Sequence, residues 1–158
     1  YLTRTGHHGQ RALRRLLTWK SRVMTDTEVP AGEFVGYGTT CLTERRTRIA
    51  VVPVGYADGY SRSLSNLGRV LIRGRRASVI GLVNMSALMV DVTRMKSVCA
   101  GDEVVLVGRQ GTLSISVGSF SELARMVDYE ALVRLPAHIP RMVTPGSAPG
   151  EASAGTAS

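Results

Sequence analysis

Four polar side chains follow the end of an apolar run and are the first candidates for chemistry. Residues 49–54 form a mainly β-branched stretch that predicts a buried strand, and Tyr56, Asp58, Tyr60 and Arg62 come directly after it, among glycines. Polar groups gathered at the mouth of a buried strand are typical of functional sites. Phenols can move protons, although an ordinary phenol, with a pKa of about 10, is a sluggish base at neutral pH. The pattern therefore predicts a site at this strand end without fixing its reaction.

Two shorter segments share the mixture of glycine and chemically active residues. The first is Val35-Gly36-Tyr37-Gly38-Thr39-Thr40, upstream of the strand, and the second is Gly81-Leu82-Val83-Asn84-Met85, downstream. Better-known signatures are absent from the chain: there is no phosphate-binding glycine loop, dinucleotide fingerprint or zinc-protease motif. The residues alone thus indicate a domain with several interesting tyrosines and no assigned chemistry.

Histidine and cysteine give no sign of a metal site. Cys41 and Cys99 lack the spacing of metal ligands or of a redox pair. His7 and His8 lie in a leader-like stretch and His138 in a predicted loop, so we expect all three to be surface imidazoles. No metal is expected.

The elements that would carry these residues are mostly short strands. Alternating or continuous apolar patterns separated by turn residues predict a strand or hairpin at 18–24, 49–54, 69–80 (turning at Gly74), 88–93, 103–107 and 130–135. Capping-box spacing from Ser119 to Glu122 predicts one short helix through Val127. We therefore expect a mainly β fold, a closed or partly open β-barrel of about eight short strands with one short helix.

Composition predicts one core domain between two extensions. A length of 158 residues, 44% of them hydrophobic, suits a single domain. Residues 1–17 read as a remnant of a preceding domain, 18–142 as the β domain, and 143–158 as a disordered tail rich in Gly, Ala, Ser and Pro. The chain shows no membrane-spanning run and no signal peptide, which favours a cytoplasmic location.

The basic character of the chain is a weak sign of nucleic-acid binding. The formal net charge is +8, and all of the basic residues except Lys20 and Lys96 are arginine. This bias resembles genomic base composition more than a selected polycation, and aromatic residues make up only 5%, too few for a base-stacking platform. Nucleic acid is therefore not the expected partner, and a free-standing basic β module that binds nucleic acid or protein stays open as an alternative.

Taken in order, the motifs identify a family resemblance. Between about Leu17 and Val143 the chain resembles the C-terminal domain of alanine racemase. The matching segments are Thr18–Val23, Pro30–Glu33, Tyr37–Thr40, Gly55–Tyr60, Leu64–Asn66, Gly81–Met85, Val90–Thr93, Gly101–Val104, Asp128–Glu130 and Ile139–Arg141.

The resemblance implies an isomerase built from two domains. Such racemases hold pyridoxal 5'-phosphate (PLP) mainly on an N-terminal α/β barrel, which is followed by a β domain like this one. They interconvert L- and D-alanine by proton transfer between two bases and supply D-alanine for bacterial peptidoglycan. Two subunits pack head to tail as a homodimer, so that the C-terminal domain of one completes the site on the barrel of the other. Tyr37 matches the catalytic tyrosine that serves one face of the substrate.

Other roles follow from the same resemblance by position. Met85 matches a substrate-binding residue whose backbone N–H meets the alanine carboxylate, and Tyr56 matches a tyrosine that lines the narrow substrate access. Arg62 matches an arginine behind it in the access corridor, and Tyr129 a tyrosine that hydrogen-bonds the cofactor phosphate.

Departures from the family pattern affect the expected amino-acid selectivity and the expected activity of this chain alone. Leu82 replaces a common arginine, Ser86 an acid and Gly36 a serine, which motivates the alternative of a racemase with broader amino-acid specificity. Neither Lys20 nor Lys96 lies in the family's cofactor motif. Because the cofactor lysine belongs to the barrel, we expect this chain alone to be inactive.

Overall fold

A computed structural model of the chain describes residues 17–36 and 38–143. The predicted leader and tail therefore lie almost wholly outside the described residues. Within this part, the elements are β1 (Trp19–Arg22), β2 (Thr25–Val29), β3 (Thr47–Val52), η1 (Tyr56–Asp58), η2 (Arg62–Leu64), β4 (Arg69–Ile72), β5 (Arg75–Ile80), β6 (Leu88–Asp91), β7 (Glu103–Gln110), β8 (Leu113–Ile115), α1 (Val117–Ala124) and α2 (Asp128–Val133), where η marks a 3-10 helix.

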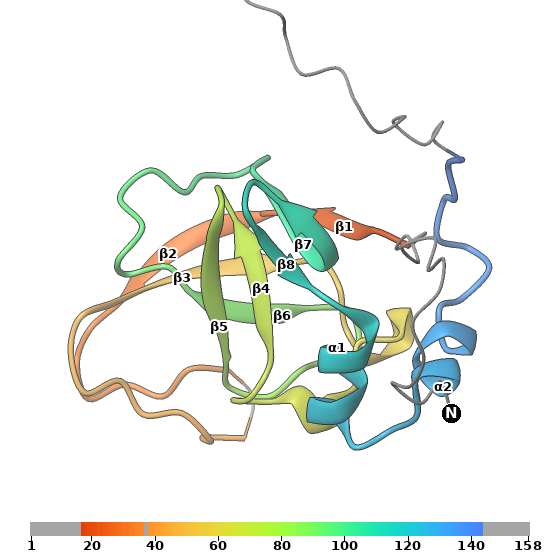
Figure 1. The fold of residues 1–158 in the computed structure, drawn as a ribbon. Helices are drawn as coiled ribbons and strands as arrows, with labels where there is room; N and C mark the ends of the chain where they lie inside the picture. The colour runs from red at the N-terminus through yellow and green to blue at the C-terminus, as the bar shows by residue number, and fades with distance from the viewer. Residues whose placement is uncertain (1–16, 37, 144–158) are drawn as a thin grey trace, which may run out of the picture.

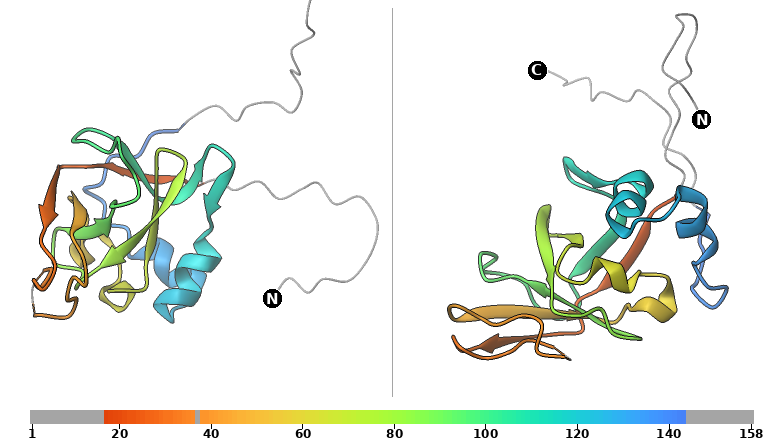
Figure 2. Two further views of the ribbon diagram at one scale, coloured as in Figure 1. Left: turned by 90° about the vertical axis from the view of Figure 1, so that its left-hand side faces the viewer. Right: turned by 90° about the horizontal axis from the view of Figure 1, so that it is seen from below.

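The strands form one antiparallel sheet in the order β1-β7-β4-β5-β6-β3-β2, with β8 added to β7 (Figure 1). The edge strands β1 and β2 follow each other in the chain, with only Val23 and Met24 between them. Val23 donates a hydrogen bond to Asp102 beside β7, and Met24 donates one to Val51 on β3. This short link draws both edges of the sheet together, so the sheet curls into a partly open barrel, as predicted (Figure 2).

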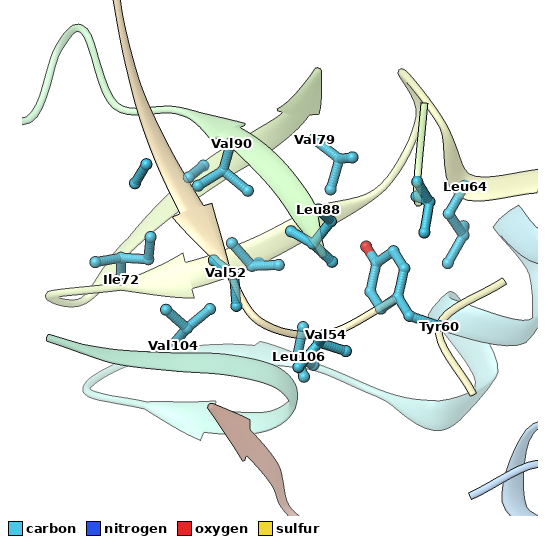
Figure 3. Packing of buried hydrophobic residues seen from close by; sticks show 14 of the residues in the cluster. Val52, Val54, Tyr60, Leu64, Ile72, Val79, Leu88, Val90, Val104 and Leu106 are labelled. Carbon is cyan, nitrogen blue, oxygen red and sulfur yellow. The ribbon is translucent and has the colours of Figure 1, made fainter. Parts of the chain in front are cut away.

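The interior of the curled sheet is filled by aliphatic side chains. Val52, Ile72, Val79, Leu88 and Leu106 are almost fully buried, and the close-up in Figure 3 shows them pointing toward one another from several strands. Branched side chains that alternate along a strand fill such an interior well.

The outer face of β4 and β7 is covered as well. On this face Ile115 of β8 packs against Leu71 of β4 and Val105 of β7. This small cluster explains why β7 is buried on both faces.

An aromatic group closes one end of the interior. Trp19 of β1, Tyr60 and Phe120 of α1 have ring centroids 5.3 to 6.2 Å apart in tilted or edge-on arrangements. Helix α1 begins at the Ser116 N-cap, whose hydroxyl accepts the Ser119 N–H and whose own N–H donates to the Ser119 hydroxyl. The predicted helix is therefore confirmed, although its N-cap is Ser116 rather than Ser119 and it ends at Ala124, before Val127; it packs against η2.

The strand predicted at 130–135 is wrong. Residues Asp128–Val133 form helix α2, with Asp128 and Glu130 in its first turn, where acidic side chains complement the helix dipole. Among the described residues, no helix has the length and apolar character needed to cross a membrane.

The loops separate into two ends of the molecule. The β4–β5 turn and the loop from β6 to β7 lie at the upper end in Figure 1, while η1, η2 and the β5–β6 connection lie at the lower end near α1. The predicted site residues Tyr56, Arg62 and Met85 all belong to the lower end.

Candidate functional site

The turn after β3 presents Tyr56 to solvent. Val54 is buried, Gly55 begins η1, and Gly59 ends it with a left-handed φ of 98°. The Asp58 carboxylate accepts the Gly55 N–H at 2.9 Å and so closes the turn on itself. With the backbone fixed in this way, the Tyr56 side chain stands out at the rim, 45% exposed.

Met85 lies directly beside this turn. The Tyr56 N–H donates to the Asn84 carbonyl and the Ala57 N–H to the Met85 carbonyl, both at 3.0 Å. A Cβ built on Gly55 would lie only 2.2 Å from the Asn84 oxygen and 2.3 Å from the Met85 oxygen, so glycine is required for this approach. Among residues 17–36 and 38–143, no acceptor is found for the Met85 N–H. This N–H is the group that the family resemblance assigns to the substrate carboxylate.

Tyr37 itself lies outside the described residues, but its neighbours on both sides are placed. Gly36 and Gly38 have left-handed φ values of 77° and 82°. A Cβ on Gly36 would lie 2.5 Å from the Met89 side chain, and a Cβ on Gly38 would lie 3.0 Å from the Leu82 side chain. The chain on either side of Tyr37 thus packs against β6 and the connection that also carries Met85.

Tyr56 and Arg62 share an open hollow of about 530 Å³, which Gly59, Ser61 and Arg134 also line. Arg62 begins η2, and its guanidinium forms no ion pair with any described residue. The structure therefore brings together two of the residues predicted for the access corridor.

Arg134 was not predicted as part of this region. It caps the end of α2, and its guanidinium pairs with Glu130 at 2.6 Å. Because sequence patterns favoured a strand here, the helical turn that brings Arg134 to the hollow could not be foreseen. Its i,i+4 spacing from Glu130 is the one signal that would have suggested a helix.

Tyr129 is separated from the hollow. Its side chain, on the first turn of α2, is 80% exposed and makes no hydrogen bond with any described residue. Val127, the N-cap of α2, and Val133, its last residue, are also largely exposed, at 66% and 79%. This apolar surface around Tyr129 is suited to contact with another protein surface.

Tyr60, the second tyrosine of the opening motif, belongs to the core. It is completely buried, and burial raises the pKa of its phenol far above the ordinary value. Its hydroxyl has no hydrogen-bond partner among the described residues. Tyr60 therefore positions the turn by packing and offers no accessible proton carrier.

His138 has a more specific place than a surface imidazole. Its Nε2 lies 3.3 Å from Asp58 Oδ1, the second oxygen of the carboxylate that closes the Tyr56 turn. The side chain is nevertheless 66% exposed.

The lysines lie elsewhere. Lys20 Nζ is paired with Glu103 at 2.8 Å, and Lys96 lies in the loop between β6 and β7, at the other end of the molecule from Tyr56. Within the described part of the chain, no three His, Cys, Asp or Glu side chains come together in a way that could hold a metal ion.

A mainly β, partly open barrel with a tyrosine-bearing turn against a methionine-bearing connection defines a known class of domain. The family model for the alanine racemase C-terminal domain matches residues 16–143, and the chain belongs to this family.

Individual relatives agree with this assignment. An alanine racemase from Halothermothrix orenii is 49% identical over 129 residues, which cover 82% of this chain and 34% of the relative. The chain thus spans about a third of the length of the curated relatives that it matches.

Solved structures give the same result. Alanine racemase from Oenococcus oeni superposes with a TM-score of 0.78 at 26% identity, covering 84% of this chain and 36% of that one. The enzyme from Bartonella henselae, solved with covalently bound pyridoxal phosphate, gives a TM-score of 0.69 at 29% identity, covering 75% and 32%.

Proposed function

We propose that this chain acts as the C-terminal domain of an alanine racemase and supplies Tyr37 to an active site completed by the barrel domain of a second subunit. The observation that carries this proposal is the shared neighbour of two segments: the residues that flank Tyr37 and the Tyr56 turn both pack against the connection that carries Met85. Each of these segments holds a residue that the family uses at its active site.

Tyr37 acts as one of two bases. Racemisation removes the α-proton from one face of alanine and returns a proton to the other, and one side chain cannot reach both faces. The cofactor, when bound, stabilises the negative charge left at the α-carbon. The Tyr37 hydroxyl then has a single task, which is to exchange a proton with that carbon on its own face. Because a phenol ordinarily has a pKa of about 10, its surroundings must favour the phenolate.

The backbone of Met85 orients the substrate. Its N–H has no partner among the described residues, and the carbonyl on the same residue is held by Ala57. A carboxylate that accepts the Met85 N–H would be fixed beside the segment that flanks Tyr37. This contact would hold the substrate so that Tyr37 can reach the α-carbon from one face, rather than leave the substrate free to rotate.

Tyr56 and Arg62 form the access to the site. They line the open hollow next to the turn, and the guanidinium of Arg62, which pairs with no described carboxylate, would attract an anionic carboxylate. Leu82 contacts Gly38 beside Tyr37 and brings no charge to this region, which supports the second candidate, a racemase of broader amino-acid specificity.

Among the described residues, Tyr129 is the one that the family resemblance assigns to PLP. Tyr129 offers an exposed phenol that fits a phosphate oxygen, but its chain neighbours Asp128 and Glu130 are acidic and would repel the other phosphate oxygens. Lys20 is paired with Glu103, and Lys96 belongs to the β6–β7 loop, which lies on the opposite side of the molecule from α2 (Figure 1). The residues present thus fit a single contact to the cofactor phosphate, and the remaining contacts must come from the barrel domains.

The surface that would contact the second subunit includes apolar side chains at the end of the molecule that carries Tyr56. Four side chains there are at least 60% exposed, namely Met85, Val127, Tyr129 and Val133. A homodimer that covers these residues would also exclude water from the proton-transfer site.

The test uses the complete two-domain enzyme with Tyr37→Phe. We expect interconversion of L- and D-alanine to fall by roughly 10²–10⁴-fold, because a positioned proton carrier contributes about this much. In D₂O, the variant should still exchange the α-proton of one enantiomer without inverting it, because the base on the opposite face is intact. Nuclear magnetic resonance follows exchange and circular dichroism follows inversion.

Tyr60→Phe is the matched control, because it removes the same hydroxyl from a buried position outside the site. This variant should keep its racemase activity. Unchanged racemisation in Tyr37→Phe would refute the assignment of Tyr37.

A further inference from the structure

A second charged hollow lies at the end of the molecule away from Tyr56. It has a volume of about 430 Å³ and is lined by Arg73, Arg75 and Arg94 together with residues 95–98. Four of the lining side chains are basic, Lys96 being the fourth, and none is acidic. The β4–β5 turn supplies two of the arginines, and the loop from β6 to β7 supplies the rest (Figure 1).

Most of this charge is uncompensated. Arg73 is paired with Asp102 at 2.7 Å, so it adds little net charge. Arg75, Arg94 and Lys96 form no ion pair with any residue of the described ranges, and the Arg75 guanidinium instead donates to the Arg94 carbonyl at 3.4 Å. Three cations that line one hollow repel one another, and an anion between them would relieve this repulsion.

Arg48 organises the backbone of the loop from the outside. Its guanidinium is held by Asp26 at 2.6 Å and donates to the carbonyls of Met95, Lys96 and Val98. Arg48 does not line the hollow.

The peptide geometry turns two donors away from Arg48. The described peptide bonds are all trans, so each N–H points opposite to the carbonyl of the preceding residue. Because the Met95 and Lys96 carbonyls face Arg48, the N–H groups of Lys96 and Ser97 point the other way. Neither N–H has an acceptor among the described residues. Successive N–H groups directed to one side are a recurring feature of anion-binding loops.

We propose that this hollow binds a phosphate-type oxyanion. The guanidinium groups of Arg75 and Arg94 would pair with its oxygens, the Lys96 ammonium would supply a further charge, and the N–H groups of Lys96 and Ser97 with the Ser97 hydroxyl would complete the donor set. A dianion with several oxygens matches these donors better than a single carboxylate does. The volume exceeds that of one phosphate, which favours pyrophosphate or a phosphoryl group on a larger molecule.

The chemistry recognised is the phosphoryl group itself. No aromatic side chain of the described residues lines the hollow, so these residues provide no surface on which a base would stack. A free phosphorylated metabolite and a nucleic-acid backbone both carry a phosphoryl group. The experiment must therefore distinguish these two sources.

The test titrates the isotope-labelled chain with inorganic pyrophosphate and follows backbone amide resonances. We expect saturable shifts at Lys96 and Ser97, and a loss of affinity of about tenfold or more in the double variant Arg94→Gln with Lys96→Gln, since each removes a charge-assisted contact. The matched control is Arg45→Gln with Arg109→Gln, which removes the same charge from exposed positions outside the hollow. The control should bind as the parent does.

A short single-stranded oligonucleotide identifies the source of the phosphate. Competition with pyrophosphate at the same amides would support the site and point to a nucleic-acid backbone, whereas pyrophosphate binding without competition would support it for a small phosphorylated ligand. The proposal is overturned if pyrophosphate causes no saturable shifts, or if both double variants weaken its binding equally, because general attraction to a cationic surface would then suffice.

Discussion

A Cβ on Gly55 would come within 2.3 Å of the Met85 carbonyl oxygen, a distance that real side chains do not tolerate. The absence of a side chain at this one position lets the Tyr56 turn and the Met85 connection share backbone hydrogen bonds. The relative position of Tyr56 and Met85, two predicted substrate contacts, thus depends on Gly55, which is not itself a predicted contact.

Gly55→Ala should therefore separate these segments. We expect the free energy of unfolding to fall by about 1–3 kcal/mol, as in other overpacked sites, and the KM for alanine to rise in the complete enzyme. Chemical denaturation and steady-state kinetics measure the two effects. Gly118→Ala is the control, because its Cβ would meet nothing closer than 3.9 Å and alanine is favoured within a helix. Equal stability of both variants would contradict the packing argument.

The Asp58 carboxylate connects the turn to the C-terminal segment. It accepts the Gly55 N–H at 2.9 Å and lies 3.3 Å from His138 Nε2. Asp58→Ala should lower the free energy of unfolding by about 1–2 kcal/mol, because it removes the acceptor that closes the turn. His138→Ala, which removes only an exposed partner, should cost less than about 0.5 kcal/mol. Thermal unfolding of the two variants provides the comparison, and a larger loss for His138→Ala would contradict this order.

The strands were predictable where sequence and tertiary context agree. The hairpin predicted at 69–80 is confirmed as β4 and β5, with a left-handed φ of 70° at Gly74, where the turn was expected. Strand β2 was missed because Thr25–Val29 is polar and mostly exposed at a sheet edge, where no hydrophobic pattern is needed.

Helix α2 shows why periodicity fails for short segments. Residues 131–133 are a continuous apolar run, which is compatible with a strand or with one helical turn. Packing against α1 favours the helix, and that contact is not visible in local sequence. For the same reason the place of Arg134 in the hollow could not be predicted, whereas Tyr56 and Arg62, close in sequence to a clear strand end, could.

The Tyr60 hydroxyl gives a stability prediction with an unusual sign. It is buried, has no partner among the described residues, and lies 2.3 Å from the position that a Gly68 Cβ would take. An unpaired buried hydroxyl costs about 1–3 kcal/mol, so Tyr60→Phe should raise the free energy of unfolding by about 1 kcal/mol. Tyr56→Phe, at a half-exposed position, should leave it unchanged. Urea denaturation distinguishes the two, and destabilisation by Tyr60→Phe would show that the hydroxyl is bonded in solution.

The same residue predicts a pH dependence at alkaline pH. Burial raises the pKa of Tyr60 in the folded state above its value in the unfolded chain, about 10. Below pH ~10 the phenol is protonated in both states and contributes no pH dependence. Above it, the unfolded state releases the proton while the folded state retains it, so stability falls as pH rises. The stability difference between parent and Tyr60→Phe should therefore widen above pH ~10, and parallel curves would contradict a buried neutral phenol.

The lysines predict that residues 1–158 cannot racemise alanine without the barrel. PLP enzymes bind the cofactor aldehyde through a lysine amine. In this chain Lys20 is paired with Glu103 at 2.8 Å, and the same pairing lowers the pKa of the Glu103 carboxyl. Lys96 belongs to the β6–β7 loop, at the other end of the molecule from the β5–β6 connection that carries Met85. Loss of the L-alanine α-proton in D₂O should proceed at the rate of PLP alone. A faster rate that Lys20→Met or Lys96→Met abolishes would show that one of these amines can serve the cofactor after all.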